Sequence, residues 1–309
     1  MLPSQVLGST DQHVFLVGRP PMGEYLSFVK VQSVGGDAID DRILGDEWRN
    51  ANDRVRQLEA EEAGFADSPP LGPLPPEAQP FRNQLLDDPV FQRSFRIVPA
   101  DVVMVELDRL VVFQKFINLT FIQQLRSTLS ASPSTEELFR FCLLGGHPQP
   151  EVQVGRIAQN AFIFTSPSTD VRFLDVALLQ AGQIGNYVPH GRLAAAAGLM
   201  VGYGSNLLNA IHVEGRLVLN NGSHRAYALR EAGLAYAPCL VQTLSRREEL
   251  EVVASGEFQQ NPDRYLKTPR PSVLKDYFDP QLRKIASVAR KVRQVKVSFG
   301  VEVLDVPAS

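Results

Sequence analysis

Cysteine is scarce in this sequence, and the scarcity limits the disulfides that the protein can form and the cellular compartments that suit it. Only Cys142 and Cys239 occur among the 309 residues, which excludes the disulfide framework of a small secreted protein. The sequence does not exclude a single disulfide between these two cysteines. Free cysteines are usually buried in a protein core, however, which favours two buried thiols in a reducing cytoplasm.

Long apolar runs and metal-binding clusters are also missing. No uncharged run of about 18 apolar residues occurs, which argues against an ordinary transmembrane helix, and no charged segment followed by an apolar stretch marks a secretory signal. We therefore expect a cytoplasmic protein without membrane insertion. Four histidines have neither a paired cysteine nor His-x-x-x-His spacing, so no zinc site is expected; they are His13, His147, His190 and His212.

A strong charge of either sign is absent as well. The 31 basic and 34 acidic residues leave a formal net charge of −3, which gives no whole-chain sign of nucleic-acid binding. One basic cluster lies near the C-terminal end, where we expect a helix over 279–292 and then a strand over 294–303. Solvation explains such a cluster, and contact with nucleic acid or an acidic partner stays open. Its six cations fall within 14 residues: Arg283, Lys284, Arg290, Lys291, Arg293 and Lys296.

The most informative positive feature is the sequence Asn-Gly-Ser-His-Arg at residues 221–225. An apolar run at 217–219 precedes it and a helix-like pattern at 226–232 follows, so a strand is expected to turn through Asn-Gly into a helix. The first turn of a helix carries free N–H donors and about half a positive charge, so it favours acids over cations. A histidine and an arginine there are explained if a phosphate or carboxylate binds between them.

This stretch also resembles a known family. Residues 217–241, LVLNNGSHRAYALREAGLAYAPCLV, resemble the G-x-H-R or G-x-R-R box of the ParB/sulfiredoxin superfamily, which holds plasmid-partition proteins, sulfiredoxins and ADP-dependent serine kinases. A weaker match over 102–129 supplies the opening strand and helix of the family. The resemblance implies an α+β fold, with a ParB/sulfiredoxin-like mixed sheet and helices, a large insertion, and N- and C-terminal extensions.

The resemblance also implies a ligand. In the relatives this strand–turn–helix holds nucleotide phosphates, and the start of the preceding helix lies beside the nucleotide. The implied ligand is ATP, ADP or CTP with Mg²⁺. Helix capping explains the two residues of that earlier helix equally well, with Thr120 as the N-cap. The implied nucleotide- or phosphate-binding residues are Gly222, Ser223, His224, Arg225, Asn118 and Thr120.

Two departures from the family argue against two of the functions that its members have. Sulfiredoxin-like enzymes carry their catalytic cysteine at the position of Ser223, and a hydroxyl cannot perform that sulfur chemistry. Sulfiredoxin activity is therefore not expected. No helix-turn-helix of the kind that partition proteins use to grip DNA is recognisable after the box, which argues against a chromosome-partition role.

Composition divides the chain into four parts. Residues 1–66 form an N-terminal extension, with a charged helix expected over 46–63 and Asp46 as its cap. Residues 67–94 form a linker or strap, because six prolines between 68 and 80 cannot donate backbone hydrogen bonds. Residues 95–255 form the core, with an insertion at about 130–205. Residues 256–309 form a C-terminal extension.

Three functions follow from these observations. The first is a nucleotide- or phosphate-binding module with a regulatory or assembly role, whose extensions mediate self-association or docking into a larger assembly. The second is a nucleotide-dependent phosphotransferase or NTPase acting on a small molecule or protein, which would need a carboxylate to hold Mg²⁺ or position the acceptor. The third is a nucleic-acid-associated protein that uses the basic stretch. The acidic candidates, which solvation at the surface also explains, are Glu106, Asp108 and Glu214.

Overall fold

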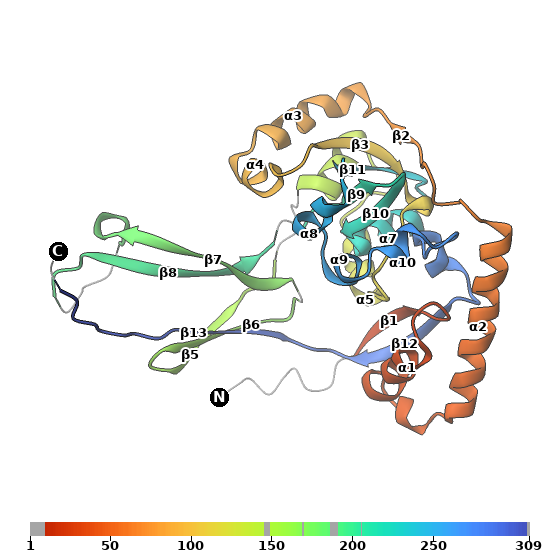
Figure 1. Ribbon diagram of the computed structural model, residues 1–309, viewed down its shortest axis with the longest axis horizontal. Coiled ribbons are helices and arrows are strands. Elements are labelled where there is room, and N and C mark those ends of the chain that lie inside the picture. Colours follow the sequence, from red (N-terminus) through yellow and green to blue (C-terminus); the bar gives the residue numbers. More distant parts are fainter. Residues whose placement is uncertain (1–9, 145–148, 169, 186–190, 205, 308–309) are drawn as a thin grey trace. The chain divides into compact units, whose positions relative to one another are not determined.

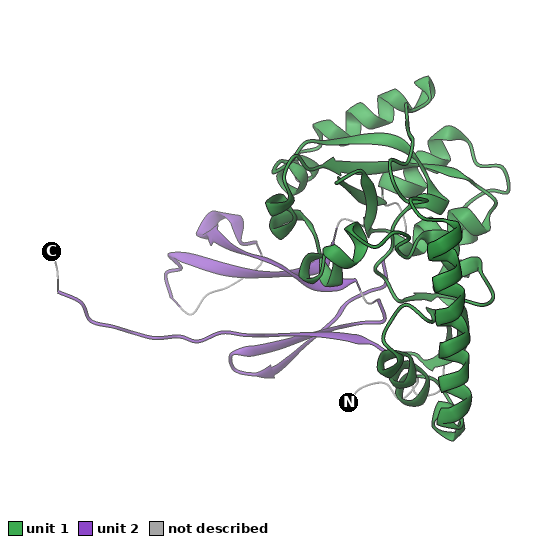
Figure 2. Cartoon of the chain, turned by 45° about the vertical axis from the view of Figure 1, so that its right-hand side comes forward, with its two compact units in different colours: residues 1–146, 206–290 green, residues 147–205, 291–309 purple. Residues whose placement is uncertain are grey.

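The computed structural model describes residues 10–144, 149–168, 170–185, 191–204 and 206–307. The fold is mixed α+β, as expected (Figure 1). The chain forms two compact units (Figure 2): unit 1 comprises residues 1–146 and 206–290, and unit 2 comprises residues 147–205 and 291–309.

A five-stranded sheet forms the centre of unit 1. Its strand order is β10-β9-β11-β3-β2, and all neighbours are antiparallel except β9 and β11, which run parallel. Six consecutive residues of β11 are buried, as expected of a strand covered on both faces. The strands are β2 (Leu71–Gly72), β3 (Ala100–Glu106), β9 (Asn209–Val213), β10 (Arg216–Asn221) and β11 (Tyr236–Thr243).

The hairpin that leads into the box is formed as its sequence predicts. Strands β9 and β10 pair antiparallel on either side of Glu214 and Gly215. Both turn residues have positive φ, 48° and 76°, which is the geometry of the tight turns that match the twist of a hairpin.

A second sheet of unit 1 has the order β12-β1-β4, and β1 (Thr10–Leu16) is its central strand. Strand β4 spans Phe116–Asn118 and β12 spans Arg283–Ala289. The helix expected over 279–292 is therefore wrong. Lysine, arginine and alanine favour a helix locally, but β1 offers a seven-residue antiparallel ladder, and tertiary pairing overrides the local preference.

The longest helix, α2 (Asp41–Glu61), begins earlier than its sequence suggests. Its N-cap is Asp40, whose side chain accepts a hydrogen bond from the Arg42 N–H at 2.8 Å, so the prediction of Asp46 as the cap is wrong. Four apolar residues of α2 are buried along one face; they are Leu44, Ala51, Val55 and Leu58.

The remaining helices of unit 1 are short and cover the two sheets. The Pro-rich segment 68–80 lies on the five-stranded sheet, where β2 pairs with β3 and Leu74 joins the main core. Helices α5 and α7 pack against each other. The helices are α1 (Met22–Ser27), α3 (Gln79–Asp87), α4 (Pro89–Phe95), α5 (Leu119–Arg126), α6 (Thr135–Phe139), α7 (Ser223–Glu231), α8 (Leu250–Val253), α9 (Gly256–Gln260) and α10 (Asp263–Leu266).

Unit 2 consists of a three-stranded antiparallel sheet, β13-β6-β5, and a long hairpin of β7 and β8. The Tyr203 hydroxyl at the end of β8 lies 2.9 Å from the Ser166 hydroxyl at the end of β6, which ties the hairpin to the sheet. The strands are β5 (Gln153–Ala158), β6 (Ala161–Ser166), β7 (Val171–Gln180), β8 (Ala195–Tyr203) and β13 (Arg293–Ser298). Throughout the part of the chain that the structure describes, no helix has both the length and the apolar character needed to cross a membrane.

Candidate functional site

The predicted strand–turn–helix at residues 217–232 is confirmed. Gly222 lies between β10 and α7 with φ 87° and ψ 22°, and its N–H donates to the Asn221 Oδ1 at 2.8 Å. A Cβ at this position would lie 2.9 Å from the Leu208 Cα and 3.1 Å from the Leu207 carbonyl oxygen. The turn therefore requires glycine for its backbone angle and for space. No side chain caps the N-terminus of α7.

A pair of glycine substitutions separates these two requirements. Gly233, at the other end of α7, has φ 88° but no neighbouring atom within 4 Å of its ideal Cβ. Gly233→Ala is expected to cost about 1–2 kcal/mol, the cost of the left-handed conformation. Gly222→Ala is expected to cost at least about 1 kcal/mol more, because backbone must also move. Urea unfolding of both variants measures the difference, and equal losses would contradict the tight packing at Gly222.

His224 is held in its neutral form. Its Nε2 accepts a hydrogen bond from the Asn118 backbone N–H at 3.1 Å, so the ring proton belongs on Nδ1. Burial, together with the nearby His13 and Arg225, lowers the pKa of His224 to about 4. The ring of Phe121 packs edge-on against it, with ring centroids 5.4 Å apart. At neutral pH this histidine is an acceptor and adds no positive charge to the helix start.

Arg225 is buried and has an internal partner. Its guanidinium donates to the Asn206 backbone carbonyl and, at 2.7 Å, to the Asn206 Oδ1. The side chain thus fixes the chain just before β9. Both features that made the helix start unusual in sequence, a histidine and an arginine, therefore have a structural explanation within the protein.

Asn118 and Thr120 lie at the start of α5, where Asn118 contacts His224. The N-cap of α5 is Asn118, whose side-chain oxygen accepts from the Phe121 N–H at 3.0 Å, so the prediction that Thr120 is the cap is wrong. The Thr120 hydroxyl instead accepts from the Gln12 N–H of β1 at 2.9 Å. The structure thus brings together the two segments that the sequence separates by about 100 residues.

Strand β1 also belongs to this region, which no local sequence pattern indicates. Asp11 accepts a hydrogen bond from the Asn118 side chain at 3.2 Å and pairs with Arg290 at 2.8 Å. The ring of His13 stacks on Phe116 of β4, with centroids 5.6 Å apart. A strand from the expected N-terminal extension therefore lies against the start of α5, and only long-range pairing could reveal it.

The other candidates from the sequence lie in ordinary surroundings. Burial raises the pKa of both thiols, Cys142 and Cys239, which are free and buried, so neither is poised as a nucleophile. His147 and His190 lie outside the described residues. Among the residues that are described, no group of three or more histidines, cysteines and acids is arranged to hold a metal. Each acidic candidate pairs with an arginine: Glu106 with Arg109 at 4.0 Å, Asp108 with Arg230 at 3.0 Å, and Glu214 with Arg247 at 3.4 Å.

The basic C-terminal cluster is partly used for internal contacts. Lys284 pairs with Glu47 of α2 at 2.7 Å, Arg290 pairs with Asp11, and Arg283 donates to the Tyr277 carbonyl at 3.3 Å. The cations of β12 therefore bind groups of unit 1 and do not form the solvated helical surface that the sequence suggests.

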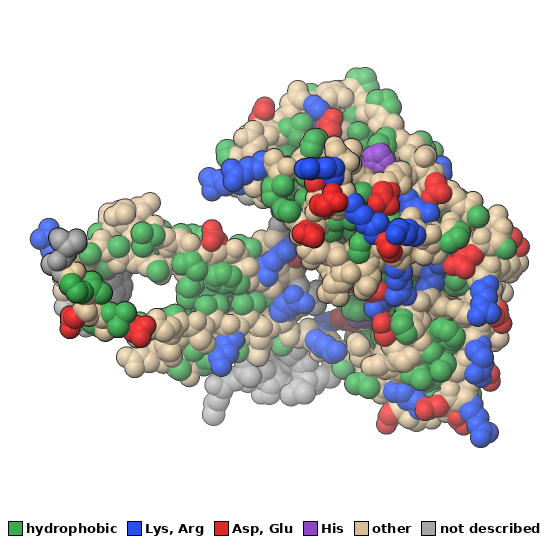
Figure 3. Space-filling view, in the orientation of Figure 1, with side chains coloured by type: hydrophobic (Ala, Val, Ile, Leu, Met, Phe, Trp, Pro, Cys, Tyr) green, Lys and Arg blue, Asp and Glu red, His purple; other side chains and the backbone are tan. Residues whose placement is uncertain are grey.

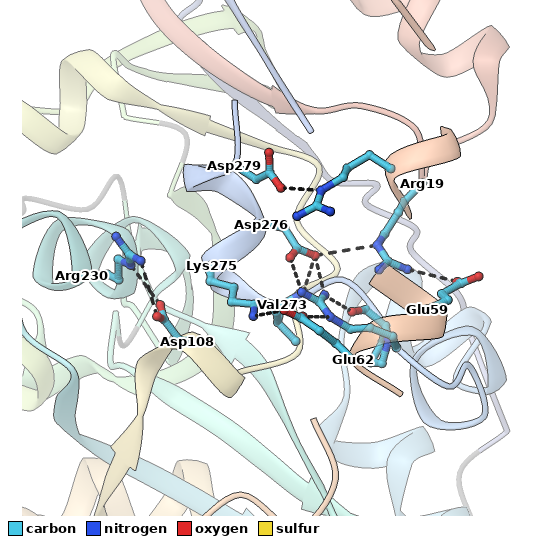
Figure 4. A network of polar contacts seen from close by, with 12 residues as sticks. Arg19, Glu59, Glu62, Asp108, Arg230, Val273, Lys275, Asp276 and Asp279 are labelled. Carbon is cyan, nitrogen blue, oxygen red and sulfur yellow. Dashed lines mark hydrogen bonds and ion pairs between the residues drawn. The ribbon is translucent and has the colours of Figure 1, made fainter. Parts of the chain in front are cut away.

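A buried ion-pair network that sequence reasoning missed joins α2 to the segment 270–276 (Figure 4). The Arg270 side chain is fully buried and donates to the two carboxylate oxygens of Asp276 at 2.8 and 2.6 Å. Its Nε donates to Glu62, the C-cap residue of α2, at 3.0 Å, and Lys275 pairs with the same carboxylate at 2.8 Å. Asp276 also accepts from the Val273 N–H at 3.1 Å. Every member of this network has an opposite charge beside it.

A cavity of about 350 Å³ opens beside this network. Its lining includes Arg54, which pairs with Asp279 at 3.1 Å, and Arg230, which pairs with Asp108 and stacks 4.2 Å from the centroid of the Phe278 ring. The charges around the cavity are therefore already balanced, and the network is structural.

Comparison of the chain with protein-family models, with curated proteins and with solved structures gives no match. The candidate site is therefore defined by its own geometry: the uncapped start of α7 at Gly222, with the start of α5 beside it.

Proposed function

We propose that this protein binds a phosphate-bearing ligand of the nucleotide class at the N-terminus of α7, as a binding module with a regulatory or assembly role. The observation that carries the proposal is the uncapped first turn of α7, which begins at a glycine in the left-handed conformation. Free N–H groups at a helix start, together with the helix dipole, form an anion site.

The start of α5 supports the same ligand. The two helix starts are close enough for the Asn118 N–H to bind the His224 ring, so the positive ends of two helix dipoles lie side by side. The buried charge of Arg225 adds to this field. A phosphate group at this place would gain favourable electrostatics without a cationic side chain at the surface.

A substitution at Ser223 tests the proposal. An acid in the first turn of a helix stabilises it by about 0.3–1 kcal/mol, but it repels a phosphate. Ser223→Asp is therefore expected to leave the free protein at least as stable as the wild type and to abolish the rise in melting temperature that ATP, ADP, CTP or tripolyphosphate produces with Mg²⁺. Thermal-shift titration measures both effects in one experiment.

Ser223→Ala is the matched control, because it keeps the backbone N–H groups and adds no charge. It should retain most of the ligand effect. Arg225→Ala is less specific, since it also releases Asn206. The proposal fails if no phosphate compound stabilises the wild type, or if Ser223→Asp responds like the wild type. Release of phosphate in the same samples would favour an NTPase over a binding module.

A further inference from the structure

The hairpin of β7 and β8 has one face made almost entirely of apolar side chains. The antiparallel register pairs Phe173 with Val201, Val176 with Leu199 and Leu178 with Ala197. Successive pairs lie on alternate faces of the hairpin. The extra residue of the bulge at position 174 shifts this alternation by one, so that Phe173 lies on the same face as Val176 and Leu178. The six side chains of these three pairs therefore share one side of the hairpin. We call this side the hairpin face.

Exposure of the hairpin face increases along β7. Val171, where the hairpin meets the three-stranded sheet, is fully buried, whereas Phe173, Val176 and Leu178 are 44%, 50% and 72% exposed. Figure 3 shows apolar side chains gathered along this hairpin. A continuous exposed apolar patch on a soluble protein usually marks a protein interface.

The charge pattern favours a second copy of the same chain as the partner. The charged residues of the two strands are Arg172 and Asp175, and their register partners, Gly202 and Met200, place both on the opposite face. In a two-fold interface the residues near the axis lie against their own copies, so a charge in the middle of the hairpin face would meet a like charge. The face carries none, and it offers no charged group to a partner of complementary charge.

We propose that two copies of this protein associate through the hairpin, hairpin face against hairpin face. Strands of nine and ten residues give a face about 30 Å long and 10 Å wide. This area is smaller than the roughly 800 Å² that each partner buries in a standard stable complex. The dimer is therefore weak, with a dissociation constant on the order of 10 μM or above.

Three lysine substitutions on consecutive residues of β7 test this arrangement. Val176→Lys and Leu178→Lys place an unpaired charge on the hairpin face, whereas Ala177→Lys places the same charge on the opposite face. Sedimentation velocity of the full chain, from about 1 to 200 μM, should show a monomer–dimer equilibrium for the wild type and for Ala177→Lys. The two hairpin-face variants should raise the dissociation constant at least about ten-fold, because burial of an unpaired charge costs more than 1.4 kcal/mol.

Circular dichroism of each variant tests whether it is folded. Because two variants change the hairpin face independently, the test still works if one of them does not fold. The proposal is overturned if the wild type stays monomeric at every concentration, which would assign the face to a different protein. It is also overturned if Ala177→Lys weakens the dimer as much as its neighbours do, since edge pairing or general repulsion would then explain the association.

Discussion

Replacing Asp276 with alanine is expected to lower the free energy of unfolding by about 3–5 kcal/mol, because the substitution leaves a buried guanidinium without its main partner. Arg270 is fully buried, and both carboxylate oxygens of Asp276 accept from it. The Val273 N–H loses its acceptor in the same variant. Glu62 remains beside Arg270 and limits the loss. Urea unfolding of the full chain, followed by circular dichroism, measures the effect.

The matched control is Asp46→Ala, which breaks a surface pair on α2. Asp46 lies 2.5 Å from Arg49, but both side chains are more than half exposed, so the loss should stay below about 0.5 kcal/mol. Replacing both buried partners, Arg270→Met with Asp276→Leu, should restore part of the stability, because no charge is left uncompensated. If Asp276→Ala cost no more than Asp46→Ala, the structural role of the network would be wrong.

The second large effect is a loss of stability in mild acid that depends on His224. Its pKa is about 4 in the folded protein, below its ordinary value of 6.5. Between these two values the unfolded chain binds the proton and the folded protein does not, so protonation favours unfolding as the pH falls. The contribution of neutral His224 to the free energy of unfolding is fully present above pH 6.5. About 3 kcal/mol of it is lost when the pH falls to 4.

His224→Gln should remove this part of the pH dependence. A glutamine oxygen can accept the Asn118 N–H but does not titrate, so variant and wild type should be similar at pH 7.5 and differ in their loss toward pH 4.5. Carboxylates titrate in both proteins, and the difference between the two pH profiles isolates the histidine. Parallel profiles would show that the ring is not held neutral.

Local pattern predicted the elements around the box because each of them is specified by neighbouring residues. The hairpin turn needs positive φ at Glu214 and Gly215, and the helix after Gly222 follows from the apolar residues beyond it. The helix predicted over 279–292 is wrong because the structure of residues 283–289 is not specified by their neighbours in sequence. The composition of this segment favours a helix, and only pairing with β1, more than 260 residues away in sequence, makes it a strand.

The candidate site was predictable only in part. Sequence identified the residues at both helix starts, but it could not show that His224 is neutral or that Arg225 binds Asn206, because both facts depend on packing. The network around Arg270 has no recognisable spacing at all: its members come from the C-cap of α2 and from a segment more than 200 residues later. Ion pairs of this kind are set by tertiary structure and leave no local signal.

The pairing of β1 with β12 has a consequence for how the chain is made. Thr10 pairs with Ala289 and Leu16 with Arg283, so one edge of β1 stays without its partner until the ribosome has synthesised residues 283–289. Contacts this distant in sequence form slowly, and an unpaired strand is open to wrong partners meanwhile. The five-stranded sheet of unit 1, completed by residue 243, can form first, and the segment carrying Asp11 and His13 would then gain its final position only after β12 has been synthesised.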